Sequence, residues 1–254
     1  MSQQYSVDFA TFCHQGDAHR LHAPGQLKKQ IESNNFEFSK LIVVYQLVNP
    51  YDYFDPLLID IPDGVWFEPQ EINNINEILK QFNINLDGQY VSQVDKVHHW
   101  KVHVVNHLAA IQRSSADYIV FADNDCWMVE QPENESWINE GMAILEKFPS
   151  AFIVSPNDGE PERFTKRFSQ QMFLARVDEF RNADFNQPEW DGNVNIPGGP
   201  MPEYWGMLEG RMELFCRMTG QYRYVLGPEY RYFHHNVLDE NGYFDTDYKK
   251  LGWL

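Results

Sequence analysis

Residues 118–127 read Tyr-Ile-Val-Phe-Ala-Asp-Asn-Asp-Cys-Trp, and this stretch decides the fold. It starts with an apolar run typical of a buried strand, and Asp123 and Asp125 follow directly. Open α/β folds bind their ligands at the carboxyl ends of such strands. Two carboxylates this close repel each other unless a cation lies between them, so the pattern predicts a Mg²⁺ or Mn²⁺ ion that carries substrate phosphates. The alternative is an Asx-type turn that merely ends a core strand.

The elements before and after this stretch alternate between strand and helix. Before it, we predict strands at 6–13 and 40–48, helices at 24–33, 71–82 and 94–113, and an irregular connection at 49–63. After it, we predict helices at 137–148, 178–181 and 207–218, strands at 151–155 and 168–175, and a last strand at 222–226 or 230–233. The opening strand-helix-strand order predicts that the first two strands are parallel.

Composition narrows the class of protein. Of the 254 residues, 43% are hydrophobic and 15% aromatic, which is typical of a folded globule. The 20 basic and 37 acidic residues give a net charge of −17, which argues against a nucleic-acid partner. Cys13, Cys126 and Cys216 are odd in number and far apart, so we expect no disulfide framework. No apolar run approaches the roughly 20 residues of a membrane helix. We therefore expect a soluble cytoplasmic protein without a transmembrane segment.

The predicted helix at 94–113 carries several histidines. His99, His103 and His107 fall on one face at i, i+4 and i+8, a spacing that can bind a transition metal. No carboxylate or cysteine completes such a ligand set, and the apolar stripe already explains the helix. A half-exposed polar face is therefore the preferred interpretation. Lys101, on the same helix, is either a solvated side chain or a ligand of a diphosphate.

Three segments in this order carry a resemblance to a known class of enzymes. They are Phe-Ala-Asp-Asn-Asp at 121–125, Trp-Gly-Met-Leu-Glu at 205–209 and Tyr-Phe-His-His at 232–235. Over most of its length, the chain resembles the DXD-type nucleotide-sugar glycosyltransferases of the GT-A class, similar to glycosyltransferase family 2. The resemblance implies an α/β fold of Rossmann-like type, a three-layer α/β/α sandwich with a mostly parallel central sheet and an antiparallel second half.

The same resemblance implies how the chain is divided. Residues 1–254 would form a single domain. Within it, residues 1–126 would bind the nucleotide sugar, residues 127–238 would bind the acceptor, and residues 239–254 would form a C-terminal tail.

The resemblance also implies an activity and its metal ligands. The expected enzyme is a metal-dependent hexosyltransferase that moves a sugar from a nucleotide-diphosphate sugar to a hydroxyl of a glycan or glycolipid, inverting rather than retaining. Asp123 and Asp125 would hold Mn²⁺ or Mg²⁺ with His234 or His235. Successive strand residues face opposite sides, so only one of the two histidines can reach the metal, and His234 is preferred.

Glu209 matches the acidic residue that inverting members place near the start of a helix. A carboxylate there can take the proton of the attacking hydroxyl. Family members usually show a second acid after it, whereas this chain has Gly210. The alternative bases are Glu203 and Asp191 in the long loop at 184–204.

The remaining site residues follow from their places in the chain. Many relatives read the base with an acid after the second strand; here Asn49 follows it, so the end of the first strand takes more of that role. The predicted donor-binding residues are Cys13, His14, Asp17, Lys101, Asp123 and Asn124. The predicted acceptor-binding residues are Trp190, Glu203, Tyr204 and Trp205.

Two other functions compete with this one. A non-catalytic module that binds nucleotide sugars or glycans would keep the scaffold and lose the base, as the Glu209-Gly210 departure allows. A phosphatase or phosphotransferase of the haloacid dehalogenase type also has a strand that ends in Asp-x-Asp, but there the motif opens the domain and Thr or Val usually follows. Here about half the chain precedes the motif, and Cys126 and Trp127 follow it.

Overall fold

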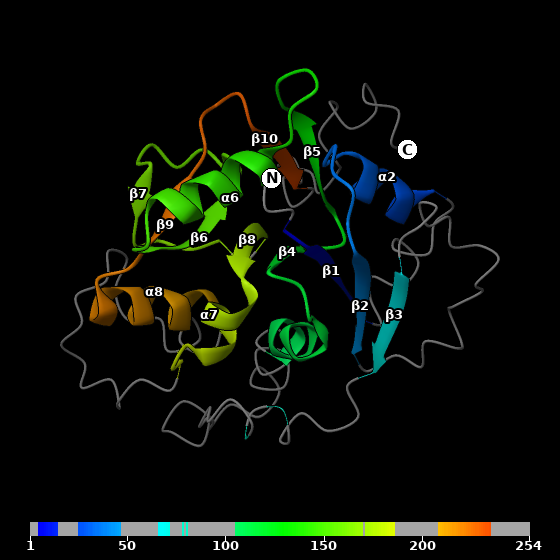
Figure 1. The fold of residues 1–254 in the computed structure, drawn as a ribbon, viewed down its shortest axis with the longest axis horizontal. Coiled ribbons are helices and arrows are strands. Elements are labelled where there is room, and N and C mark those ends of the chain that lie inside the picture. The colour runs from blue at the N-terminus through cyan, green and yellow to red at the C-terminus, as the bar shows by residue number, and fades with distance from the viewer. Residues whose placement is uncertain are drawn as a thin grey trace, which may run out of the picture.

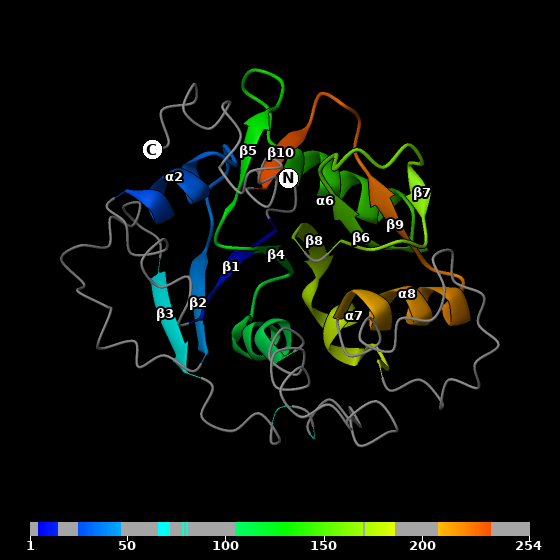
Figure 2. The same ribbon diagram turned by 180° about the vertical axis from the view of Figure 1, so that it is seen from behind.

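The computed structural model describes residues 5–14, 25–46, 66–71, 78, 80, 105–169, 171–185 and 208–234. At 13–14, 46, 66–71 and 234 it describes the backbone. Within these ranges, helices cover both faces of a central sheet, which Figure 1 and Figure 2 show from opposite sides.

The central sheet has eight strands in the order β3-β2-β1-β4-β8-β6-β9-β7. Their bounds are β1 Val7–His14, β2 Lys40–Gln46, β3 Trp66–Glu71, β4 Tyr118–Ala122, β6 Ala151–Ser155, β7 Phe164–Thr165, β8 Met172–Arg176 and β9 Tyr222–Val225. The strands from β3 to β4 are parallel, β8 runs against both of its neighbours, and β9 is parallel to β6. All described strands of this sheet except β7 and β8 therefore point the same way.

A second sheet of two antiparallel strands continues directly from the acidic stretch. It consists of β5 (Cys126–Glu130) and β10 (Arg231–His234). In Figure 1 the pair stands at the top of the molecule, beside helix α2 (Gln26–Glu32). This pairing brings the end of the described chain back to the turn that follows β4.

The strands of the central sheet alternate their side chains between two cores. Phe9 and Val120 face the core that α2 shares with α6 (Trp137–Lys147). Phe12 and Phe121 face the opposite core, beneath a helical segment at 105–113, α7 (Val177–Asn182) and α8 (Leu208–Thr219). This is the three-layer α/β/α arrangement with a mostly parallel sheet that the sequence predicts, and the predicted fold class is confirmed.

Helix α6 shows why these segments fold as they do. Its N-cap Ser136 accepts a hydrogen bond from the Ile138 amide (3.3 Å) and donates one to the Asn34 carbonyl (2.7 Å). The cap therefore also links α6 to the end of α2. Along the helix, Trp137, Ile138 and Leu145 are fully buried against the sheet.

Most predicted elements are confirmed, but three strands were not predicted. Those three are β3, β5 and β7. Both alternatives for the last strand exist, as β9 and β10, and β8 begins at Met172 rather than at 168. The predicted connection at 49–63 lies outside the described residues. Of the predicted helix at 71–82, three residues are described: Ile78 and Lys80 are helical, whereas Glu71 is the last residue of β3, so the predicted start of the helix at 71 is wrong.

The expectation of a half-exposed histidine face is wrong for His107. Its side chain is only 1% exposed, and its ring lies 4.4 Å from that of Phe12, 5.1 Å from that of Phe121 and 5.8 Å from that of Phe173. His107 is therefore part of the aromatic core between the 105–113 helix and the sheet. His99, His103 and Lys101 lie outside the described residues.

In the part of the chain that the structure describes, no helix is long and apolar enough to cross a membrane.

Candidate metal and substrate site

The acidic stretch forms a tight turn between β4 and β5. The Cys126 amide donates to the Asp123 carbonyl (2.9 Å), which closes a β-turn over 123–126. The Asp123 amide donates to the carbonyl of Gln171 (2.8 Å), just before β8. The turn therefore lies where β4 ends and the antiparallel β8 begins, at the carboxyl-end edge of the parallel strands.

Two buried amide side chains hold the turn from other elements. Asn124, at the tip, is 6% exposed and donates from Nδ2 to the Phe12 carbonyl of β1 (3.0 Å). Gln30, from α2, donates from Nε2 to the carbonyls of Asp123 (2.6 Å) and Cys126 (2.9 Å). The predicted donor residue Asn124 thus has a structural contact, which fixes the turn to the first strand.

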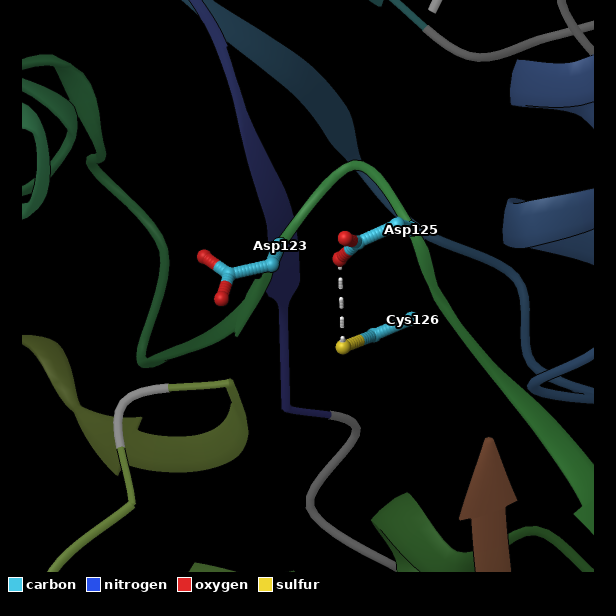
Figure 3. A group of neighbouring side chains, drawn as sticks. All are labelled: Asp123, Asp125 and Cys126. Atoms are coloured by element: carbon cyan, nitrogen blue, oxygen red, sulfur yellow. Dashed lines mark hydrogen bonds between the residues drawn. The ribbon is translucent and has the colours of Figure 1, made fainter. Parts of the chain in front are cut away.

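The carboxylates of Asp123 and Asp125 lie together with the thiol of Cys126. One ligand atom from each residue lies within 4.8 Å of the other two. The Cys126 Sγ donates to Asp125 Oδ1 (3.8 Å), as the dashed line in Figure 3 marks. In that view Asp125 and Cys126 extend beneath the arch of the turn, and Asp123 extends outward from its other arm.

The two carboxylates fit a hard divalent cation, and the thiol does not. Oxygen ligands lie about 2.1 Å from Mg²⁺, so two on opposite sides of one ion are about 4.2 Å apart. The ligand atoms of Asp123 and Asp125 lie within 4.8 Å of each other, which is close to this span. Burial, then the charges of Asp125 and Asp123, raise the pKa of the Cys126 thiol well above its usual value. A neutral thiol that donates to Asp125 orients the carboxylate, whereas oxygen atoms are the ligands that Mg²⁺ and Mn²⁺ prefer.

The strand register brings one of the two predicted histidines to this turn. In the β5–β10 ladder, the Cα partner of Cys126 is His234, and that of Trp127 is Phe233. The rings of Trp127 and Phe233 stack with centroids 5.2 Å apart, which secures the pairing. The backbone of His234 thus lies opposite the residue that follows Asp125. His235 lies outside the described residues.

The end of β1 also lies beside the turn. Thr11 pairs with Ala122, the last residue of β4, so the backbone of Cys13 and His14 continues past that strand toward the acidic residues. The topology therefore brings together the backbone of two predicted donor residues and the predicted metal ligands.

A polar network that the sequence did not reveal borders the turn. The Tyr232 hydroxyl donates to Gln171 Oε1 (2.8 Å), and Gln171 is the residue whose carbonyl accepts the Asp123 amide. Burial raises the pKa of Tyr232, and the nearby Cys126 and Asp158 add to the rise. Asp158, after β6, is ion-paired with the buried Arg223. These contacts join residues far apart in the sequence, and no local motif signals them.

Glu209 lies in the first turn of α8, as predicted, and its side chain is half-buried. It does not belong to the acidic cluster of the turn. The other predicted site residues lie outside the described part of the chain: Asp17, Lys101, Trp190, Glu203, Tyr204 and Trp205.

Fold and site together define an α/β protein of Rossmann-like architecture, with an acidic turn at the carboxyl edge of its sheet that fits a divalent cation. No protein-family model matches the sequence, and no curated protein matches it significantly.

Among solved structures, the chain is similar to two of LgtC. One is of an active-site mutant (11% identity, TM-score 0.41), and one is of the galactosyltransferase with donor and acceptor sugar analogues (10% identity, TM-score 0.38). Each match covers 68% of this chain and 59% of LgtC, so the chain spans less than two thirds of that protein. The function proposed below rests on the chain's own strand order and acidic turn.

Proposed function

We propose that the protein is a metal-dependent glycosyltransferase of the GT-A type. It would move a sugar from a nucleotide-diphosphate sugar to a hydroxyl of a glycan or glycolipid, with inversion. The observation that carries the proposal is the Asp123–Asp125 turn at the carboxyl edge of the sheet, with the ends of β1 and β10 beside it. A cytoplasmic location stays a prediction.

Asp123 and Asp125 would hold Mn²⁺ or Mg²⁺, and His234, with its backbone opposite Cys126, would complete the set. His235 is the alternative. When bound there, the cation would neutralise the charge that builds on the departing diphosphate. The protein's own part is to hold both carboxylates on a turn that β1, α2 and the start of β8 anchor.

The donor would lie along the same edge of the sheet. The backbone of Cys13 and His14 extends toward the turn, so these residues and Asp17 would contact the nucleotide. Asn124 would act through the turn that it anchors to Phe12. Lys101 would contact the diphosphate.

The acceptor would be activated by a carboxylate, with Glu209 as the proposed base. It would accept the proton of the hydroxyl that attacks the anomeric carbon. Glu203 and Asp191 are the alternative bases, and Trp190, Tyr204 and Trp205 would form an apolar wall for a sugar ring.

Donor turnover tests the proposal. The protein would be incubated with UDP-, GDP- and dTDP-sugars and Mn²⁺, and release of nucleoside diphosphate would be followed with and without EDTA. A transferase usually transfers some donor sugar to water, so we expect slow release from one donor that EDTA abolishes. A binding module would instead show thermal stabilisation by one donor without release. Neither turnover nor stabilisation with any donor would contradict the proposal.

The base assignment has its own test. Glu209→Gln should keep donor affinity and lower kcat by at least about 100-fold, the scale of general-base catalysis. Glu140→Gln is a matched control, because Glu140 is also an acid in the first turn of a helix and is exposed. Full activity of Glu209→Gln would exclude Glu209 as the base.

A further inference from the structure

Gln30 has a place in the site that no sequence motif marks. It lies on α2 and is fully buried, and its amide nitrogen reaches both ends of the acidic turn. The distances from Nε2 are 2.6 Å to the Asp123 carbonyl and 2.9 Å to the Cys126 carbonyl. One NH₂ group thus links the first and last residues of the β-turn that carries Asp123 and Asp125.

The two hydrogen bonds from Gln30 oppose the repulsion between the carboxylates of the turn. Two carboxylates held within 4.8 Å repel each other, and this repulsion favours a wider turn. The Asp123 carbonyl accepts from both the Cys126 amide and Gln30, so the Gln30 bond reinforces the contact that closes the turn. Among the contacts of the described residues, loss of the side chain would leave the Cys126–Asp123 backbone hydrogen bond between the two ends.

The amide oxygen of Gln30 gives a second reason to assign it a role at the site. Gln30 Oε1 is buried and has no hydrogen-bond partner among the described residues. A buried acceptor without a partner costs stability, and an apolar side chain of the same shape would avoid that cost. The amide nitrogen is therefore the part of the side chain that explains a glutamine here.

We propose that Gln30 is a positioning residue for the metal-binding carboxylates. Because it donates hydrogen bonds to the carbonyls of both Asp123 and Cys126, it keeps the two carboxylates close enough to share one cation. This inference rests on the proposed function, because it takes the turn to be the metal site.

Gln30→Met tests the inference, since methionine has nearly the same shape and no N–H donor. The measurement is the Kd of Mn²⁺ alone by calorimetry, without nucleotide, well below the unfolding temperature of each variant. Gln131→Met is the matched control, because Gln131 Nε2 also donates to a backbone carbonyl, that of Ser33 (2.9 Å), and neither residue belongs to the turn at 123–126.

We expect Gln30→Met to weaken Mn²⁺ binding about 10- to 100-fold, the usual effect of losing a residue that orients metal ligands. Gln131→Met should bind Mn²⁺ like the wild type. If Gln30→Met does not fold, Gln30→Asn takes its place, since its shorter side chain cannot span both carbonyls and should also weaken binding.

The outcomes separate this inference from the proposed function. Wild-type protein that binds no Mn²⁺ would overturn the metal site itself and the inference with it. Wild-type and Gln30 variants that bind Mn²⁺ equally would leave the metal site standing and overturn the role of Gln30. A loss of affinity as large in Gln131→Met would also overturn it, because the effect would then be general destabilisation.

Discussion

At the scale of single residues, Asp125 carries the sharpest prediction. Asp125→Asn removes one of the two adjacent charges, so Mn²⁺ binding should weaken by more than about 100-fold, beyond the effect of losing a residue that only orients ligands. The metal-free variant should unfold at the same temperature as the wild type or higher, because like-charge repulsion is relieved. Calorimetry and thermal unfolding measure the two effects.

Asp178→Asn is the control for this substitution, because the Asp178 side chain is 89% exposed and forms a surface ion pair with Arg181. It should leave Mn²⁺ affinity unchanged. Wild-type Mn²⁺ affinity in Asp125→Asn would contradict the assignment of Asp125 as a ligand.

The sequence was informative for residues whose neighbours along the chain define their setting. Asp123 and Asp125 could be predicted because an apolar strand directly precedes them. Gln30 could not, since its hydrogen-bond partners lie 93 and 96 residues away. The prediction that His107 is half-exposed was wrong because three aromatic rings of the sheet cover its side chain. Helical spacing alone does not show such contacts.

At the scale of elements, apolar runs predicted the central strands, and three strands were missed, of which β5 is itself apolar over Cys126–Val129. β3 contains Pro69 and two glutamates, and it lies at the edge of the sheet, where proline is tolerated. β7 has two residues, and β5 owes its structure to pairing with the distant β10. Such strands form through tertiary pairing more than through local propensity.

Helix α6 packs closely on the sheet at the buried Gly141. A Cβ at Gly141 would lie 2.9 Å from Leu174 Cδ2 and 3.5 Å from Val154 Cγ1. Gly141→Val should therefore lower the free energy of unfolding by about 1–3 kcal/mol through overpacking, despite the better helix propensity of valine. Chemical denaturation measures it.

Ala143→Val is the comparison, because Ala143 is exposed on the same helix and gains the same branched side chain. This substitution should lower the free energy of unfolding by about 0.5 kcal/mol or less. A Gly141→Val variant as stable as the wild type, or more stable, would show that helix propensity rather than contact with the sheet sets the effect at Gly141.

The starts of β1 and β4 are joined by a carboxylate with a shifted pKa. The Ser6 amide and hydroxyl each donate to Asp117 Oδ2 (2.8 Å), and these bonds lower the pKa of Asp117 below its usual value. A lowered folded-state pKa contributes stability above the unfolded value of about 4, which is lost as pH falls through the folded value. Asp117→Asn should thus be less stable than the wild type near pH 6, and the difference should shrink below about pH 4.

Denaturant unfolding of both proteins across this pH range measures the difference. A gap in unfolding free energy that stays constant down to the acid limit of the fold would exclude a contribution from ionised Asp117.

At the scale of the whole molecule, one sheet crosses both halves of the predicted domain. β4 pairs with β1 on one side and with β8 on the other, and the predicted boundary between residues 126 and 127 falls inside β5. We therefore expect a single cooperative transition, seen at the same denaturant concentration by circular dichroism and tryptophan fluorescence. Two separated transitions would contradict the single-domain prediction.

The strand-and-helix order predicted the class of this fold, whereas the pairing of its second half could not be predicted. An antiparallel strand between two strands that are parallel to each other, as β8 is, has the same apolar pattern as a parallel one. The pairing of β5 with β10, which brings His234 to the turn, joins segments about a hundred residues apart. Contacts of this kind arise only when the chain is folded.

A crystal structure with Mn²⁺ and a nucleoside diphosphate tests the central claim most directly. Anomalous scattering locates the manganese without reference to the protein density. We predict one manganese ion bound by Asp123 and Asp125, with the diphosphate beside it at the carboxyl edge of the sheet. Manganese bound away from this turn, or a diphosphate bound elsewhere on the molecule, would contradict the account.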